Sequence, residues 1–274
     1  MGGDVISSRT NTRVKQLRAA FQGQARLSGG LVAIEGEHLV EEAVRSGVSL
    51  TTVFMSEGWQ KGVPRGPEVV RLTADVFRSA VETQAPQGIA ALIVPPQFEL
   101  EDVLGRDGYA ALILVAAGLQ DPGNVGTLVR SAEAFGATGV LTTLGTVSVW
   151  NQKALRASVG SVFRVPVVGA TASELRELKA GGVRLMAAVG AEGDDVVAAQ
   201  EMDLTGACAV MIGNEGAGLG EEWMEMSDVR VTIPCPGDVE SLNAAVAGSL
   251  LLYEASRQRA GALGSKGEPR TRLR

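Results

Sequence analysis

Residues 109–145, YAALILVAAGLQDPGNVGTLVRSAEAFGATGVLTTLG, decide the fold class that this sequence predicts. Within them, YAALILVAAG indicates a buried strand, DPGNVGTLVRSAEAFGA a loop followed by a helix, and TGVLTTLG a second strand. Strands that are apolar throughout and alternate with helices are typical of a parallel sheet, because helices cover both of its faces.

The same alternation continues toward the C-terminus. We expect strands at FRVPVV, VRLMAAVG, CAVMIG and VRVTIP, and helices at NQKALRASVGSV, ASELRELKAGG, EEWMEMSD and SLNAAVAGSLLLYEASRQRA. The prediction is an α/β domain over residues 109–260, with a mostly parallel sheet covered on both faces, and a disordered tail over 261–274.

The N-terminal part predicts a second, smaller α/β domain. The strands LVAIEG, LTTVFMS, VVRL and GIAALIVPP alternate with the helices EHLVEEAVRSG and TADVFRSAVE. We place this domain at residues 1–97 and a linker with one short helical turn at 98–108.

Composition limits the class of protein. The chain has 274 residues, of which 45% are hydrophobic and 20% charged, which fits a soluble globular protein and not a disordered one. No apolar run approaches the roughly 20 residues that span a bilayer, and the N-terminus lacks a signal peptide, so we expect a cytoplasmic protein. Cys208 and Cys235 are the only cysteines and His38 the only histidine, which argues against a disulfide framework or a zinc site.

Three loops that follow predicted strands carry unusual polar residues. The first, DPGNVG, contains Asn124, with Arg130 six residues further along the chain. The second is GNEGAGL, with Glu215, and the third is IPCPGDVESLNAAVAG, with Ser241 and Asn243. Each has a structural interpretation of its own: a turn, a solvated arginine, or Ser241 as the N-cap of the final helix. Because ligands of open α/β sheets bind beyond the carboxyl ends of the strands, the three loops together predict one shared site.

These three loops, in this order, resemble the motifs of the SpoU/TrmH family of RNA ribose 2′-O-methyltransferases, over roughly residues 110–260. The resemblance implies S-adenosylmethionine as the cofactor, a deep trefoil knot in the C-terminal domain and a homodimer. The apolar helix AAVAGSLLLYEA suits packing against a second copy. The pattern N..VK.LR at 11–18, followed by the segments IEGEHLVEEAV and PQGIAAL, resembles, less specifically, an L30e/L7Ae-like substrate-binding domain.

By position, the resemblance also assigns site residues. It implies that the catalytic residues are Asn124, Arg130, Glu215, Ser241 and Asn243, and that the cofactor-binding residues are Leu141, Thr142, Gly213, Asn214, Ile233 and Leu242. The loop GNEGAGLG lacks the lysine of a phosphate loop, which would repel a sulfonium cation. We expect Glu215 to counter positive charge nearby, including that of Arg130, and Arg130 to clamp an RNA phosphate. No metal is expected.

The basic N-terminal segment is a candidate RNA-binding surface. Arg9, Arg13, Lys15 and Arg18 follow one another without an intervening acid, although such a run is also compatible with a solvated helix face. The expected partner is a structured RNA with a loop, such as ribosomal RNA, whose unpaired nucleotides can enter a pocket.

Alternatives stay open from the sequence. The substrate could be a transfer RNA. PCPG at 234–237 suggests a cytosine-5 RNA methyltransferase with Cys235 as nucleophile, although the chain lacks a Gly-x-Gly-x-x-Gly after its first strand. A non-catalytic RNA-binding protein is the third alternative, and the complete set of motif residues speaks against it.

Overall fold

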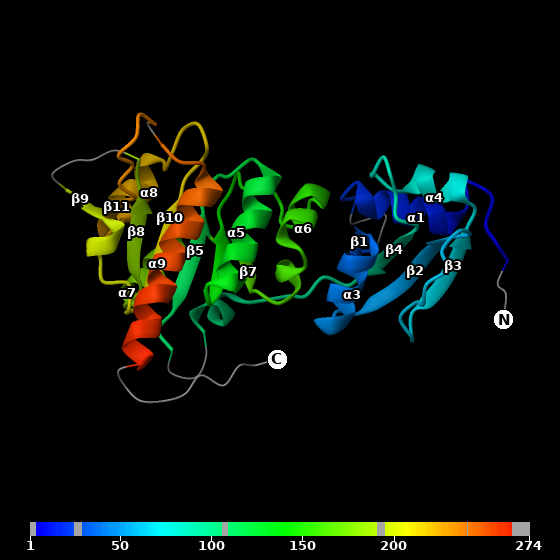
Figure 1. Ribbon diagram of the computed structural model, residues 1–274, viewed down its shortest axis with the longest axis horizontal. Coiled ribbons are helices and arrows are strands. Elements are labelled where there is room, and N and C mark those ends of the chain that lie inside the picture. The colour runs from blue at the N-terminus through cyan, green and yellow to red at the C-terminus, as the bar shows by residue number, and fades with distance from the viewer. Residues whose placement is uncertain (1–3, 25–28, 106–108, 191–194, 240, 265–274) are drawn as a thin grey trace. The chain divides into compact units, whose positions relative to one another are not determined.

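The computed structural model describes residues 4–24, 29–105, 109–190, 195–239 and 241–264 (Figure 1). The chain forms two compact units, which are described separately. Unit 1 comprises Met1–Gln97 together with Trp150–Arg164, and unit 2 comprises Phe98–Val149 together with Val165–Arg274. The short segment Trp150–Arg164 therefore packs with unit 1, although it lies within the stretch for which the sequence predicts the C-terminal domain.

Unit 1 is built on a mixed four-stranded sheet in the order β1-β4-β2-β3. Its strands are β1 (Val32–Glu35), β2 (Leu50–Ser56), β3 (Glu68–Leu72) and β4 (Ile89–Ile93). β4 is antiparallel to both β1 and β2, whereas β2 and β3 are parallel. The predicted α/β alternation of this part is confirmed.

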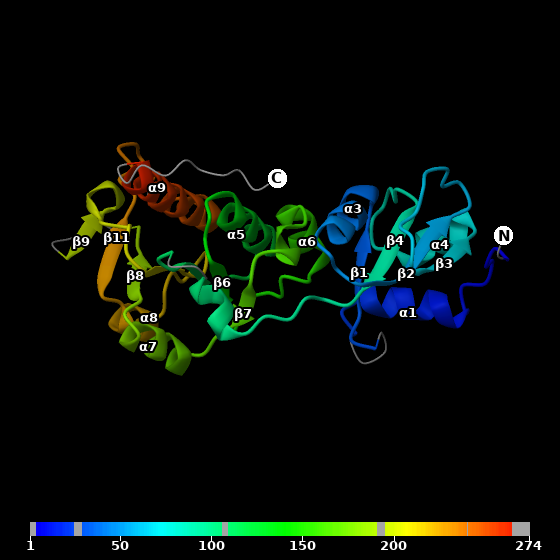
Figure 2. The same cartoon turned by 90° about the horizontal axis from the view of Figure 1, so that it is seen from below.

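Helices cover both faces of this sheet. The helices α1 (Thr12–Phe21) and α3 (Glu37–Arg45) lie on opposite sides of the strands in Figure 2, and α4 (Ala74–Ala80) packs with α1. Leu17 of α1 and Phe77 of α4 meet Phe54 of β2 in one buried cluster. The basic segment thus begins a helix whose apolar positions build the core of unit 1.

The segment α6 (Gln152–Ser158) and η2 (Ser161–Phe163) is held in unit 1 by specific contacts. The side-chain amide of Gln152 donates to the Ala33 carbonyl at 2.8 Å. Arg164 donates to Glu42 at 2.7 Å, and this carboxylate is only 6% exposed. A buried carboxylate needs such partners, since an unpaired charge there would strongly destabilise the fold.

Unit 2 contains a seven-stranded sheet in the order β7-β6-β5-β10-β8-β11-β9, and each of its strand pairs is parallel. Its strands are β5 (Leu112–Ala116), β6 (Gly139–Thr142), β7 (Val167–Gly169), β8 (Arg184–Ala188), β9 (Val196–Ala198), β10 (Cys208–Ile212) and β11 (Val229–Thr232). The predicted parallel α/β sheet is confirmed. The short strand β9 was not expected, because three residues are too few to show a periodicity.

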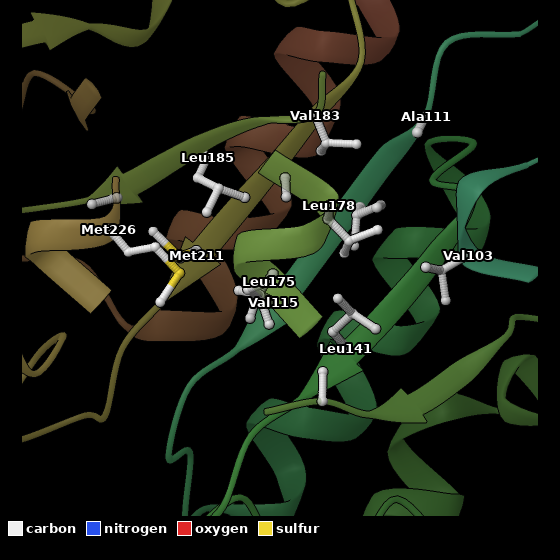
Figure 3. Packing of buried hydrophobic residues seen from close by; sticks show 14 residues of the cluster. Val103, Ala111, Val115, Leu141, Leu175, Leu178, Val183, Leu185, Met211 and Met226 are labelled. Atoms are coloured by element: carbon white, nitrogen blue, oxygen red, sulfur yellow. The ribbon is translucent and has the colours of Figure 1, made fainter. Parts of the chain in front are cut away.

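Two layers of helices enclose this sheet. In Figure 2, α5 (Pro122–Ala134) and α9 (Ala244–Gly264) lie on one side, and α7 (Ala172–Ala180) and α8 (Glu221–Met226) on the other. Figure 3 shows the core beneath the second layer, where Leu175 and Leu178 of α7 pack over Val115 and Met211 of the central strands. The deep trefoil knot stays a prediction.

The predicted linker is part of this core. It contains the 3-10 helix η1 (Leu100–Leu104), and Val103 of η1 is fully buried (Figure 3). A Cβ atom at Gly139 would lie 2.6 Å from the Cβ of Val103, so only glycine allows this close approach.

The final helix differs at both ends from the prediction. It begins at Ala244 and extends to Gly264, whereas residues 265–274 of the predicted tail lie outside the described residues. Near its end, Arg259 donates to the carbonyls of Leu204, Ala110, Ala111 and Gly206, which ties α9 to the start of β5 and to the segment before β10. Among the helices that the structure describes, none is long and apolar enough to cross a membrane.

Candidate functional site

A cavity of about 450 Å³ opens at the carboxyl edge of the unit 2 sheet. Its walls are the segments that follow β8, β10 and β11, together with the start of α9. The lining residues are Ala188, Val189, Gly190, Ile212, Gly213, Asn214, Glu215, Gly216, Gly218, Val231, Ile233, Cys235, Ser241, Leu242, Asn243, Ala244, Ala247 and Leu251. This volume is typical of small-ligand and cofactor sites. Parallel strands explain the location, because all their carboxyl ends lie at one edge.

The loop after β10 is a tight, self-supporting turn. The backbones of Asn214 and Gly218 exchange two hydrogen bonds of 2.9 Å, and Gly218 has φ +69°. The Asn214 side-chain oxygen accepts from the backbone N–H groups of Gly216 and Ala217. A Cβ atom at Gly213 would overlap with the backbone of Gly218 and Leu219, so the turn requires glycine there.

Three predicted catalytic side chains form one polar relay beside the cavity. The Asn243 side-chain N–H donates to Asn124 Oδ1 at 3.1 Å, and the Asn124 side-chain N–H donates to Glu215 Oε1 at 2.9 Å. The Glu215 carboxylate also accepts from the backbone N–H groups of Gln120 and Asp121, at 3.3 and 3.2 Å. Residues from α5, the β10 loop and the start of α9 are thus joined.

The direction of this relay is determined at both ends. At one end, Asn243 Oδ1 accepts from the backbone N–H groups of Ala245 and Val246, which can only donate. At the other end, an ionised carboxylate can only accept. Asn124 must therefore turn its amide nitrogen toward Glu215 and its oxygen toward Asn243.

The environment keeps Glu215 ionised. Partial burial opposes ionisation, but the hydrogen bonds from the Asn124 side chain and from the Gln120 and Asp121 backbone outweigh it, so the pKa of Glu215 is lowered. We expected Glu215 to counter the charge of Arg130, and the structure corrects this. Arg130 is exposed on α5, and within the described residues no ion pair joins it to a carboxylate.

Ser241 lines the cavity, but it does not cap the final helix as expected. The helix begins at Ala244, and the Asn243 side chain receives the first backbone N–H groups instead. The reason is spacing: an N-cap side chain reaches the N–H groups two and three residues further along. Ser241 is exposed, and its hydroxyl does not cap α9.

The predicted cofactor-binding residues divide into two groups. Gly213, Asn214, Ile233 and Leu242 line the cavity. Leu141 and Thr142 do not line it: Leu141 is fully buried in the core (Figure 3), and both belong to β6, which β5 separates from β10. The sequence reasoning missed Ala188, Val189 and Gly190, although the predicted strand VRLMAAVG ends there at a glycine.

The cysteines have different surroundings. Cys235 is half-buried, lines the cavity, and donates its thiol hydrogen to the Ile233 carbonyl at 3.3 Å. Cys208 is buried on β10, and this burial raises the pKa of its thiol. Both cysteines are free. Within the residues the structure describes, no group of three or more His, Cys, Asp or Glu side chains is arranged to hold a metal ion.

The basic residues of unit 1 are partly neutralised on its surface. Arg9 forms an ion pair with Asp75 at 2.5 Å, and Arg13 forms one with Glu68 at 2.8 Å. Arg18 donates to the Ser79 carbonyl at 3.4 Å, whereas Lys15 is exposed on α1. Exposed ion pairs contribute little free energy, so an RNA phosphate can compete for these side chains.

Comparison with known proteins decides what kind of site this is. The model of the SpoU rRNA methylase family matches residues 111–253, which contain all three loops. The chain belongs to the SpoU rRNA methylase family. A second model, described as an MRM3-like substrate binding domain, matches residues 11–91 of this SpoU methylase.

Relatives align along nearly the whole SpoU methylase. The 23S rRNA (guanosine(2553)-2'-O)-methyltransferase RlmP of Bacillus subtilis (strain 168) is 34% identical over 251 residues, covering 90% of this chain and 97% of its own length. The 23S rRNA (guanosine-2'-O-)-methyltransferase RlmB of Xylella fastidiosa (strain 9a5c) is 34% identical over 231 residues, 82% and 91% of the two chains. The activities in these two names do not favour the cytosine-5 alternative.

Solved structures of methyltransferases superpose on nearly the whole chain. The SpoU methyltransferase AviRb from Streptomyces viridochromogenes, in complex with the cofactor AdoMet, superposes with a TM-score of 0.80 at 28% identity, covering 91% of this chain and 98% of its own. An RNA 2'-O ribose methyltransferase reaches 0.78 at 32% identity, covering 94% and 100%. The α/β fold of this RNA methyltransferase, with its separate N-terminal substrate-binding domain, is thereby confirmed.

Proposed function

We propose that this SpoU methylase transfers a methyl group from S-adenosylmethionine to a ribose 2′-hydroxyl of ribosomal RNA. The observation that carries the proposal is the relay of Asn243, Asn124 and Glu215, which borders a cofactor-sized cavity in a chain of this family. The relatives RlmP and RlmB act, by their names, on guanosine in 23S rRNA.

The cavity suits this cofactor chemically. Its wall combines apolar side chains, such as Ile233 and Leu242, with the backbone of the glycine loop, a combination that fits an uncharged adenosine. Among the lining residues that the structure describes, none is a lysine, an arginine or a histidine, and Glu215 is the only acid. When bound, S-adenosylmethionine supplies an electrophilic methyl group on a sulfonium cation. We assign the binding to Gly213, Asn214, Ile233 and Leu242.

Arg130 is proposed to hold the RNA. Its guanidinium is exposed and has no carboxylate partner within the described residues, so it is available for a phosphate oxygen. It cannot serve as a base, because an arginine stays protonated in proteins. We propose that the proton of the 2′-hydroxyl passes to a phosphate oxygen that Arg130 clamps, while Ser241 and Asn243 orient the ribose. Positioning then supplies most of the acceleration.

The assembly and location are part of the proposal. Val246, Leu250 and Tyr253 of α9 are 47%, 43% and 51% exposed and share one face of the helix. We propose that this face packs against a second copy in a homodimer, with unit 1 supplying RNA affinity through Arg9, Arg13, Lys15 and Arg18. A monomeric mass at micromolar concentration would contradict the dimer. Cytoplasmic location follows from a ribosomal substrate.

The test is to map modified nucleotides in RNA from cells with and without the gene. A 2′-O-methyl group blocks attack of the 2′-oxygen on the neighbouring phosphate, so the modified position resists alkaline hydrolysis. We expect a resistant ribosomal RNA position that disappears with the gene. A resistant position in transfer RNA alone would change the substrate class. A methylated base, with a protein–RNA adduct at Cys235, would refute ribose chemistry.

A further inference from the structure

The turn Thr143–Thr146 follows β6 at the same edge of the sheet as the cavity. It is closed by a hydrogen bond of 3.0 Å from the Thr146 N–H to the Thr143 carbonyl, and Gly145 has φ +87°. Thr143 is buried and Thr146 is half-buried, whereas Leu144 is 99% exposed. Both hydroxyl oxygens lie within hydrogen-bond distance of the Gly118 N–H, just after the end of β5.

The Thr146 hydroxyl joins this turn to the end of β5 in two directions. It donates to the Ala116 carbonyl at 2.8 Å and accepts from the Gly118 N–H at 3.0 Å. The Gly118 N–H also approaches the Thr143 hydroxyl at 3.2 Å. A hydroxyl can donate and accept at the same time, and neither an alanine nor a valine can replace it there.

Gly118 is held from its other side by the relay loop. Its carbonyl accepts from the Asn214 side chain at 2.9 Å. Two and three residues further along, the N–H groups of Gln120 and Asp121 donate to Glu215. The segment 116–121 therefore lies between the β6 turn and the β10 loop, as expected from the strand order β6-β5-β10.

This segment leads directly to the reacting groups. The Asp121 side chain caps α5 by accepting from the Asn124 N–H at 2.9 Å, and α5 carries both Asn124 and Arg130. A shift of Gly118 would move the two N–H groups that hold Glu215, and with them the start of α5. Displacements on the order of 1 Å are sufficient to slow an enzyme about 100-fold.

We propose that Thr146 is a positioning residue for methyl transfer, which holds Gly118 so that the Gln120 and Asp121 N–H groups meet Glu215. The inference rests on the proposed function. Thr146 touches neither cofactor nor substrate in this assignment. It acts through the backbone of the segment 116–121, on the orientation of Asn124 and Arg130.

The chain offers a matched control at the opposite end of β6. The Thr138 hydroxyl donates to the Val103 carbonyl and accepts from the Leu112 N–H at 3.1 Å. It therefore makes the same kind of backbone bonds in the same sheet, but at the amino edge, whereas the cavity lies at the carboxyl edge. Replacing either threonine with valine keeps the shape and removes the hydroxyl.

The experiment compares Thr146→Val, Thr146→Ser and Thr138→Val in the full-length protein. For Thr146→Val we expect kcat at saturating RNA to fall about tenfold, with cofactor affinity by calorimetry unchanged within about threefold. Hydrogen exchange of the peptide that contains Gly118 should accelerate, because its N–H loses an acceptor. Thr146→Ser keeps the hydroxyl, so its kcat and its protection of the Gly118 N–H from hydrogen exchange should match those of the wild type. Thr138→Val should lower the melting temperature and leave kcat unchanged.

The outcomes separate the two claims. If the wild-type protein methylates no ribose 2′-oxygen, the proposed function fails, whatever the variants do. If the wild type is active and Thr146→Val matches it in kcat, or Thr146→Ser fails to restore it, the positioning role is wrong. Loss of folding in Thr146→Val also overturns the proposal, since Thr146 would then be a residue of the fold.

Discussion

Replacing Glu215 with glutamine tests the polar relay directly. Three donors converge on the carboxylate: the Asn124 side chain and the backbone N–H groups of Gln120 and Asp121. A glutamine has one carbonyl oxygen, which accepts from at most two of them, and its NH₂ group faces the third donor. Asn124 can then turn over, and the direction of the relay toward Asn243 is lost.

The size of the effect follows from these contacts. A hydrogen bond to a charged group contributes about 1.5–3 kcal/mol when buried. Because Glu215 is exposed, water satisfies part of the lost bonding, and we expect about 1–1.5 kcal/mol, which is roughly a 5- to 13-fold decrease in kcat. The assay is single-turnover methyl transfer at saturating RNA. Glu221→Gln removes the same charge from an exposed residue of α8 and should leave kcat unchanged.

The pH dependence gives a second readout. Folding lowers the pKa of Glu215, so its contribution to stability is present above the ordinary carboxylate pKa and is lost as pH falls through the lowered one. The difference in melting temperature between wild type and Glu215→Gln should therefore be constant from about pH 6 to about pH 9 and shrink in acid. The relay would be refuted if Glu215→Gln had the same kcat as the wild type and if the difference in melting temperature between the two proteins did not shrink in acid.

Three other substitutions test the remaining assignments. Arg130→Ala should lower methyl transfer on the order of 100-fold or more, with cofactor affinity unchanged, whereas Arg176→Ala, which removes an exposed ion pair to Glu222, should have no effect. If Arg130→Ala turned over at the wild-type rate, the proposed contact between Arg130 and an RNA phosphate would be wrong. Cys235→Ser should keep its activity, because the nucleophile belongs to the ribose, and loss of activity with a trapped adduct would contradict this. Joint replacement of Arg9, Arg13, Lys15 and Arg18 by glutamine should weaken RNA binding and reduce its salt slope by about 3, without changing cofactor affinity. If the salt dependence of RNA binding did not change, these four residues would not form the RNA-binding surface.

Much of the architecture was determined by sequence patterns of short range. Apolar runs such as ALILVAA and CAVMI indicate buried strands, and their alternation with helices predicts a parallel sheet. The same rule placed the three polar loops at one edge of the sheet. The boundaries of the final helix and the strand β9 were missed, because caps and three-residue strands leave little periodic signal.

The tertiary structure decided how the site residues are used. The resemblance of the sequence motifs singled out Asn124, Glu215 and Asn243, but the contacts that join them span 91 and 119 residues. No local spacing could therefore show that Glu215 holds Asn124 and, within the described residues, forms no ion pair with Arg130. The tertiary structure also showed that the Asn243 side chain caps α9, that Leu141 is a core residue, and that the Thr146 hydroxyl accepts a hydrogen bond from the Gly118 N–H. Periodicity determines which face of an element is buried, because that depends only on neighbours along the chain. Which polar groups meet at the sheet edge depends on strand order and packing, and these exist only in the folded molecule.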